Sequence, residues 1–204
     1  MVTIMWGRLL ISVLAAYALW FFTFSTSLST FWLRLAFSVA ALILISFWMR
    51  GRRLLQSFRK TRPLSLLSGV LVGLGLYLLL LAGYALLEPY VASSAGEVYL
   101  LRREAEPLYI ALLLIFTSIG EEIFWRGFLL QELREALGII YALLVASSIY
   151  STVHLWTMNV PLMMIAFIAG MVWGLLYVRT GSLSSVSISH IVWTELVFII
   201  APLQ

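Results

Sequence analysis

The sequence contains no cysteine and no aspartate, and Lys60 is its single lysine. Without cysteine the chain can form no disulfide, thiol nucleophile or thiolate metal site. Any catalytic chemistry must therefore come from glutamate, histidine, serine, threonine, tyrosine or arginine. Charged residues make up only 11% of the 204 residues, against 63% hydrophobic residues. A soluble domain of this size could not bury that much apolar surface, so the composition predicts an all-α, polytopic membrane protein.

Seven stretches of the chain are long and apolar enough to cross a membrane. A spanning helix needs about 20 mostly apolar residues. The expected spans are 5–24, 30–49, 64–87, 107–131, 138–157, 160–178 and 182–203. Four tryptophans near the ends of these spans are predicted to be interfacial anchors: Trp6, Trp20, Trp32 and Trp48. The sequence therefore predicts about seven transmembrane helices.

The basic residues indicate how these helices are oriented. The net charge of +4 comes from arginines, many of which lie in the loop 50–62. Cytoplasmic loops carry an excess of arginine and lysine, so this loop and the N-terminus are predicted to be cytoplasmic. Counting outward places the loop 88–106 and the C-terminus outside, and a turn at 132–135 inside. Because the basic charge is gathered in one loop of a membrane protein, no binding of nucleic acid is expected.

The polar groups that could carry chemistry lie in the second half of the chain. The first three predicted spans contain no acidic residue. We therefore divide the chain into residues 1–106, the N-terminal transmembrane helices with the basic loop, and residues 107–204, a four-helix catalytic core.

Three charges lie inside the fourth predicted span, where charge is costly. Glu122 and Arg126 are four residues apart and share a helix face, so we expect an ion pair that fixes local geometry. Glu121 is turned roughly 100° away, toward Trp125. One glutamate is therefore paired while its neighbour stays available for chemistry.

The two histidines of the chain, His154 and His190, both fall within predicted spans. Tyr150 and Thr194 each place a hydroxyl four residues away, on the face of one histidine. At a rise of about 1.5 Å per residue, Glu121 and His154 lie roughly 20 Å, and His190 roughly 12 Å, from their cytoplasmic ends. These depths allow one cavity, in which the groups could activate water directly or through a bound metal.

The polar residues also allow other interpretations. A buried histidine can also bridge helices without binding a ligand. Glu195 lies on a different face from His190 and could pair with Arg126, face a cavity or stay protonated. The serine-rich run 182–189 indicates close helix packing rather than a nucleophile. No His-Glu-x-x-His motif is present, which excludes a zinc site of the soluble-protease type.

Three segments resemble motifs of one family, the CAAX-protease and bacteriocin-processing family, which includes the type II CAAX prenyl endopeptidases. Residues 117–129 resemble its first motif, Glu-Glu-x-x-x-Arg. Residues 150–154, Tyr-Ser-Thr-Val-His, resemble the second, usually Phe-x-x-x-His, and residues 190–194 occupy the place of the third, usually His-x-x-x-Asn. The order and approximate spacing agree over about residues 107–200.

The resemblance implies a set of roles for these residues. In the family the first glutamate and first histidine position the attacking water, which corresponds to Glu121 and His154 here. The second histidine and the asparagine stabilise the oxyanion, which corresponds to His190 and Thr194. Thr194 departs from the pattern, because a threonine hydroxyl is shorter than an asparagine amide. Loss of a good oxyanion donor costs about 10²–10³ in rate.

The expected function is an intramembrane endopeptidase that hydrolyses a peptide bond at or in the membrane without a covalent acyl-enzyme. Its partners would be membrane lipid and a peptide or protein substrate, with or without an attached lipid. Glu121, His154 and His190 could also supply three ligands to a divalent metal such as zinc, with an open fourth position. The alternatives are a scaffold or immunity protein that retains the fold, and a proton-coupled transporter.

Overall fold

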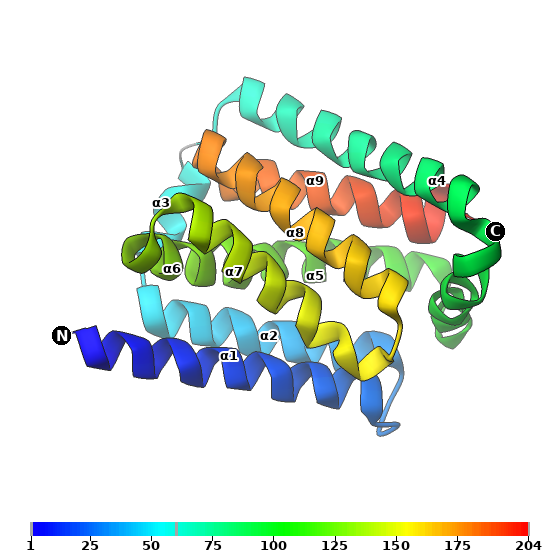
Figure 1. Cartoon of the computed structure of the whole chain (residues 1–204), viewed down its shortest axis with the longest axis horizontal. Helices are drawn as coiled ribbons and strands as arrows, with labels where there is room; N and C mark the ends of the chain where they lie inside the picture. Colours follow the sequence, from blue (N-terminus) through cyan, green and yellow to red (C-terminus); the bar gives the residue numbers. More distant parts are fainter. Residues whose placement is uncertain (1, 60, 204) are drawn as a thin grey trace.

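The computed structural model describes residues 2–59 and 61–203, which form a bundle of long helices (Figure 1). Seven helical segments are long and apolar enough to span a membrane. They are Trp6–Ser25, Phe31–Arg50, Pro63–Glu104, Pro107–Leu137, Ile139–Thr157, Val160–Thr180 and Leu183–Ile200. The predicted all-α, polytopic membrane fold is confirmed.

The nine α-helices in the described residues are α1 (Val2–Ser25), α2 (Phe31–Arg50), α3 (Arg53–Arg59), α4 (Pro63–Leu100), α5 (Pro107–Glu122), α6 (Leu130–Leu137), α7 (Ile139–Thr152), α8 (Val160–Thr180) and α9 (Leu183–Glu195). A π-helical turn, Ile123–Leu129, joins α5 to α6, and a second one, Leu196–Ile200, extends α9. Short 3₁₀ turns extend α4 to Glu104 and α7 to Thr157. The expected turn at 132–135 is wrong, because these residues lie within α6 and the chain turns only at Gly138.

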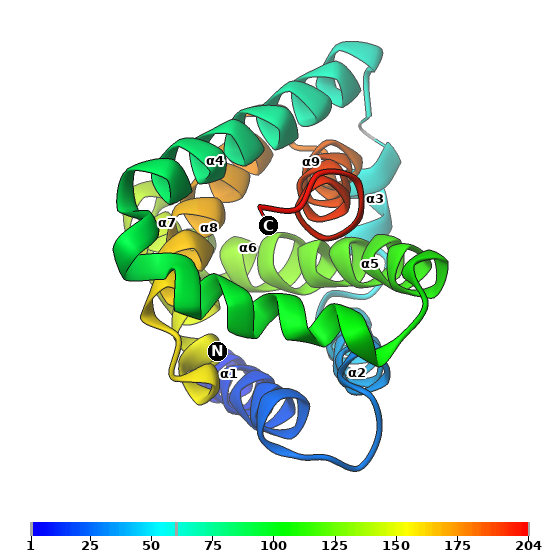
Figure 2. The same cartoon turned by 90° about the vertical axis from the view of Figure 1, so that its right-hand side faces the viewer.

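Helices from both halves of the chain share one core. Helix α9 packs against α4, α5 and α8, while α2 packs against α1 and α5 (Figure 2). The largest cluster of buried hydrophobic residues contains Trp20 from α1 together with Trp125 and Trp173 from the second half. The division at residue 106 remains a prediction from sequence.

Helices α4 and α9 touch through their backbones. A Cβ atom added at Gly69 would collide with the backbone oxygen of Ser185, and one added at Gly73 would lie 2.6 Å from that of Ser189. The hydroxyl of Ser185 donates to the carbonyl oxygen of Ser65 at 2.6 Å. Small residues allow this approach, so the serine-rich run serves close packing, as predicted.

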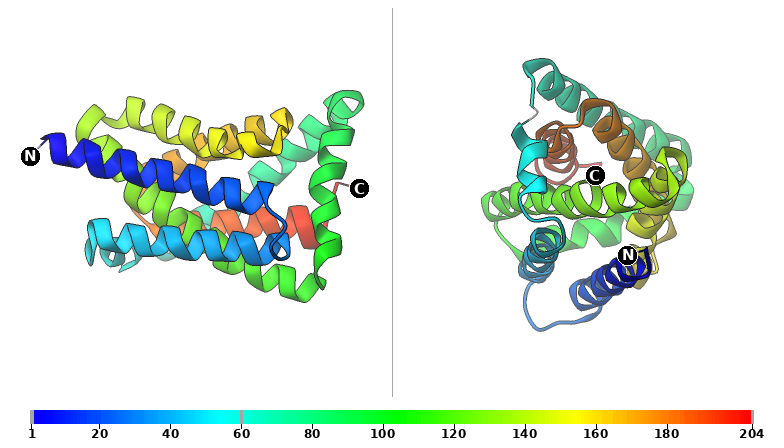
Figure 3. Two further views of the ribbon diagram at one scale, coloured as in Figure 1. Left: turned by 90° about the horizontal axis from the view of Figure 1, so that it is seen from below. Right: turned by 90° about the vertical axis from the view of Figure 1, so that its left-hand side faces the viewer.

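The third span is longer than predicted. Residues 88–106 were expected to form a loop. This prediction is wrong for residues 88–104, because the helix continues through Pro89 and then runs across the end of the bundle (Figures 2 and 3). A proline inside a helix removes one hydrogen bond and bends the helix without ending it here. We call residues 90–104 the arm. The indole of Trp32 donates to the Leu101 carbonyl at 2.8 Å, which ties the arm to α2.

Two of the four predicted interfacial tryptophans have a different role. Trp6 and Trp48 are exposed on the bundle surface, as an anchor requires. Trp20 and Trp32 are buried, and each donates a hydrogen bond from its indole N–H to a protein partner. Trp20 and Trp32 do lie near helix ends, as predicted, but neighbouring helices cover both side chains.

Candidate active site

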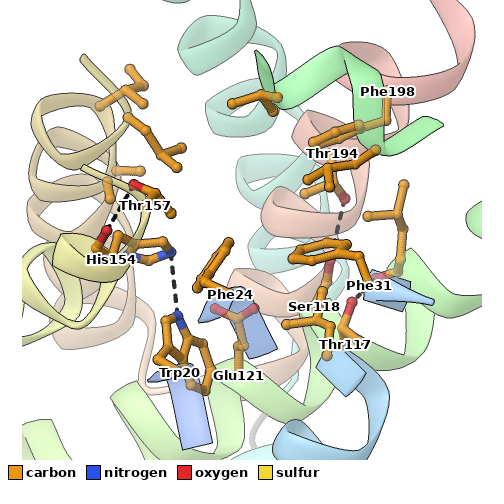
Figure 4. A pocket seen from close by; sticks show the side chains of 18 of the residues that line it. Trp20, Phe24, Phe31, Thr117, Ser118, Glu121, His154, Thr157, Thr194 and Phe198 are labelled. Atoms are coloured by element: carbon orange, nitrogen blue, oxygen red, sulfur yellow. Dashed lines mark hydrogen bonds between the residues drawn. The ribbon is translucent and has the colours of Figure 1, made fainter. Parts of the chain in front are cut away.

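One cavity of about 330 Å³ is lined by Glu121, His154, His190 and Thr194. In Figure 4, His154 lies on one wall, Ser118 and Thr194 lie on the other, and Glu121 lies between them. The remaining wall is largely aromatic and comes from α1, α2 and the end of α9, with Trp20, Phe24, Phe31, Trp32, Trp193 and Phe198 among its residues. The N-terminal helices therefore complete a cavity whose polar groups come from the second half.

Glu121 lies in the last turn of α5, immediately before the π-helical turn, and its side chain is 8% exposed. The phenol of Tyr150 lies beside its carboxylate. The second family motif usually has phenylalanine at the position of Tyr150, so the tyrosine hydroxyl is a mild departure from that motif. In the structure it gives Glu121 a polar neighbour that phenylalanine could not provide.

Glu122 lies behind the cavity, is fully buried and has two cationic or polar partners. Its Oε1 accepts a hydrogen bond from Arg126 Nη1 at 2.9 Å and from His190 Nδ1 at 2.8 Å. The pairing with Arg126 was expected from their spacing, but the contact with His190 was not. This second contact fixes the imidazole so that its other nitrogen, Nε2, is left for the cavity.

Arg126 is held by several groups at once. Its Nη2 donates to the Gly170 carbonyl at 3.3 Å. Its guanidinium carbon lies 4.8 Å from the Tyr150 ring centroid and 5.2 Å from that of Trp173. Glu195 does not pair with it: Glu195 Oε1 is buried without a hydrogen-bond partner among the described residues. Arg126 therefore positions Glu122 and makes no contact with Glu195.

Two tryptophans that the sequence did not mark as site residues hold the histidines. The His190 ring stacks on Trp173 with centroids 4.0 Å apart. His154 Nδ1 lies 2.9 Å from the Tyr150 carbonyl, which can only accept, so this nitrogen carries the proton. His154 Nε2 then accepts from Trp20 Nε1 at 3.4 Å. A tryptophan near a span end looks like an anchor in sequence, so no signal marked Trp20 as a site residue.

Thr194 and Ser118 form a pair of hydroxyl groups on the cavity wall, 3.2 Å apart. Thr194 donates back to its own helix, with the His190 carbonyl 3.0 Å away. The only asparagine in the chain, Asn159, also lines the cavity, but its amide donates to the Ser94 carbonyl and accepts from Leu162 N–H. Of the Ser118 and Thr194 hydroxyls, Ser118 therefore has fewer competing partners.

The predicted metal ligands do not form one coordination site. In the part of the chain that the structure describes, no group of three or more acidic or histidine side chains lies close enough to hold a metal ion. Both ring nitrogens of His154 already have protein partners. The arrangement of Glu121, His154 and His190 does not fit a three-ligand metal site, and we derive no step through a metal.

Part of the chain matches a known protein family. Residues 103–195 match the family described as type II CAAX prenyl endopeptidase Rce1-like. The matched segment runs from the end of the arm to the last residue of α9 and includes the six predicted site residues. Neither the curated proteins nor the solved structures give a significant match. Residues 103–195 of this multi-pass membrane protein therefore resemble the Rce1-like type II CAAX prenyl endopeptidase family.

Proposed function

We propose that the protein is an intramembrane endopeptidase in which Glu121 and His154 activate a water molecule for attack on a peptide carbonyl. The observation that carries this proposal is the gathering of Glu121, His154 and His190 in one cavity. The match of residues 103–195 to the Rce1-like family supports the same reaction.

In the first step, the Glu121 carboxylate takes a proton from water as the water oxygen attacks the scissile carbonyl carbon. His154 Nε2 accepts a hydrogen bond from the same water, since its 3.4 Å bond from Trp20 is long enough to be displaced. The C–N bond of the tetrahedral intermediate then breaks, and Glu121 returns the proton to the leaving amine. No covalent bond to the protein forms.

The oxyanion is stabilised from the opposite wall. In its doubly protonated form His190 donates from Nε2 to the oxyanion, while Nδ1 donates to Glu122 behind it. The Ser118 hydroxyl, which donates to Thr194 before the reaction, turns to donate to the oxyanion as the second donor. This pair of hydroxyls takes the place that the family motif gives to asparagine.

The substrate that fits is a polypeptide segment with an apolar part. A second cavity of about 300 Å³ lies between α4, α8 and α9 and is almost entirely apolar. The residues that line both this cavity and the active-site cavity are Val98, Asn159, Leu162, Ile165, Trp193 and Phe198. An apolar side chain or an attached lipid chain could lie there while the scissile bond faces Glu121.

Replacement of Glu121 by glutamine tests the proposal, because it removes the base with almost no change in shape. We expect cleavage of a quenched fluorescent peptide library by the purified protein in nanodiscs to fall by at least about 10²–10⁴-fold. Glu195→Gln is the matched control: it neutralises another intramembrane glutamate that lies outside both cavities, and cleavage should persist.

Full activity of Glu121→Gln would exclude this glutamate as the base. If the unmodified protein cleaved no peptide in the library, the result would favour the alternative of a scaffold protein that retains the fold. The residue that favours this alternative is Thr194, where the family motif has asparagine. A variant with Thr194→Asn would then show whether restoring the family residue restores cleavage.

A further inference from the structure

The two ends of the helical bundle differ in charge. One end holds the start of α1, the connection from α2 to α4, and the ends of α6 and α8, on the left in Figure 1. Its glutamates are Glu132 and Glu135. Its described arginines are Arg8, Arg50, Arg52, Arg53, Arg59, Arg62, Arg134 and Arg179. We call it the basic end.

The opposite end, where the arm meets α5, has few free basic groups. Arg102 and Arg103 lie in the arm. Arg34 lies near this end but is buried, and it donates to the carbonyl oxygens of Thr23 and Ser29. The glutamates at this end are Glu88, Glu97, Glu104 and Glu106. Its basic charge is therefore far lower than that of the basic end.

The active-site cavity opens at this less basic end. Glu97 in the arm and Trp156 at the end of α7 line the cavity and are both exposed. Tyr150 and His190, deeper in the bundle, line it and are buried. None of the charged residues that the structure describes at the basic end contributes to its wall. A substrate therefore reaches Glu121 from the end that carries the arm.

We propose that the active site faces the extracytoplasmic side of the membrane. Short loops rich in arginine and lysine stay in the cytoplasm, and acidic residues contribute little to this rule. Because the basic end is short-looped and arginine-rich, it belongs in the cytoplasm, which puts the cavity mouth on the other side. The orientation stands on charge and geometry, without reference to catalysis.

The consequence for the substrate rests on the proposed function. An enzyme with this orientation takes a polypeptide segment that lies at the outer face of the membrane, such as part of an exported or membrane-anchored protein. It would not reach the C-terminal segment of a protein that stays in the cytoplasm. The apolar second cavity beside the mouth suits a segment that is partly embedded in the outer leaflet.

Single cysteines test the orientation directly, because the natural chain has none. Met158→Cys and Leu28→Cys place a thiol at strongly exposed positions of the cavity end, since these residues are 87% and 81% exposed. Gln56→Cys, on an exposed position of α3, is the matched site at the basic end. Each variant is treated with a charged, membrane-impermeant maleimide in intact spheroplasts and again after permeabilisation.

We expect both cavity-end variants to be labelled to the same extent before and after permeabilisation, and Gln56→Cys only afterwards. The reverse pattern would overturn the proposal, and so would equal labelling at the two ends, which indicates mixed orientation. Labelling of neither cavity-end site before permeabilisation would also overturn it.

A second measurement separates orientation from catalysis. Quenched peptides carrying a charged, impermeant tag are added to right-side-out and to inverted vesicles. Vesicles that contain the Glu121→Gln variant give the background rate of cleavage. We expect cleavage only by right-side-out vesicles. Cleavage only by inverted vesicles would overturn the orientation, whereas cleavage by neither, with the expected cysteine labelling, would count against the proposed function alone.

Discussion

Two neighbouring hydroxyl residues of α5 have different roles, although their positions in the sequence give no sign of it. Thr117 and Ser118 both line the cavity. Thr117 donates to backbone carbonyls of its own helix, with the Leu113 oxygen 2.9 Å away. The Ser118 hydroxyl, among the described residues, is hydrogen-bonded only to Thr194, 76 positions later in the chain. The sequence predicted Thr194 as the departure from the family motif. It could not predict Ser118, because that pairing depends on how α5 and α9 meet.

This difference predicts different outcomes for two conservative variants. Ser118→Ala removes the hydroxyl that is free to turn toward the oxyanion, and we expect kcat to fall by about 10²–10³-fold with little change in KM. Thr117→Val removes a hydroxyl that is committed to the backbone, and kcat should fall far less. Steady-state kinetics on a peptide selected from the library gives both values. Equal losses in the two variants would show that Ser118 is not an oxyanion donor.

The helices were predicted well where a continuous apolar run defines them and poorly where geometry is irregular. The number of spans was predicted correctly, and their ends mostly agree within a few residues. The π-helical turn after Glu122 and the arm beyond Pro89 were missed. A π-helical turn depends on a local shift of hydrogen bonds that no residue pattern marks. The arm is stabilised by contacts to α2, which only the folded bundle supplies.

Close contact between α4 and α9 predicts contrasting effects for two glycines of the same helix. Gly69→Ala would drive a methyl group into the Ser185 backbone oxygen, which cannot move without separating the helices. We expect a loss of about 1–3 kcal/mol, the usual effect of overpacking. Gly75 has open space around its Cβ position, so Gly75→Ala should leave stability unchanged or slightly raised. Thermal unfolding in detergent compares them, and matching midpoints would contradict this packing.

At the scale of the whole molecule, the bundle decides which polar groups meet. Depth along each helix correctly indicated that Glu121, His154 and His190 could reach one cavity. Depth gives no information on rotation about the helix axes, and rotation determines which partner each side chain has. The structure shows His190 bonded to Glu122 and His154 bonded to Trp20. These partners, from helices distant in the chain, separate the three groups into different parts of the cavity wall.

This separation leads to a prediction about metals. Three ligands for zinc must approach one point at about 2.0–2.2 Å, and no such group exists among the described residues. We therefore expect peptide cleavage to survive prolonged treatment with a strong chelator, and added zinc to give no increase. The Glu121→Gln variant, measured in parallel, sets the background. Loss of cleavage on chelation with recovery on adding zinc would mean that the side chains rearrange around a metal, and that Glu121 acts as its ligand rather than as a free base.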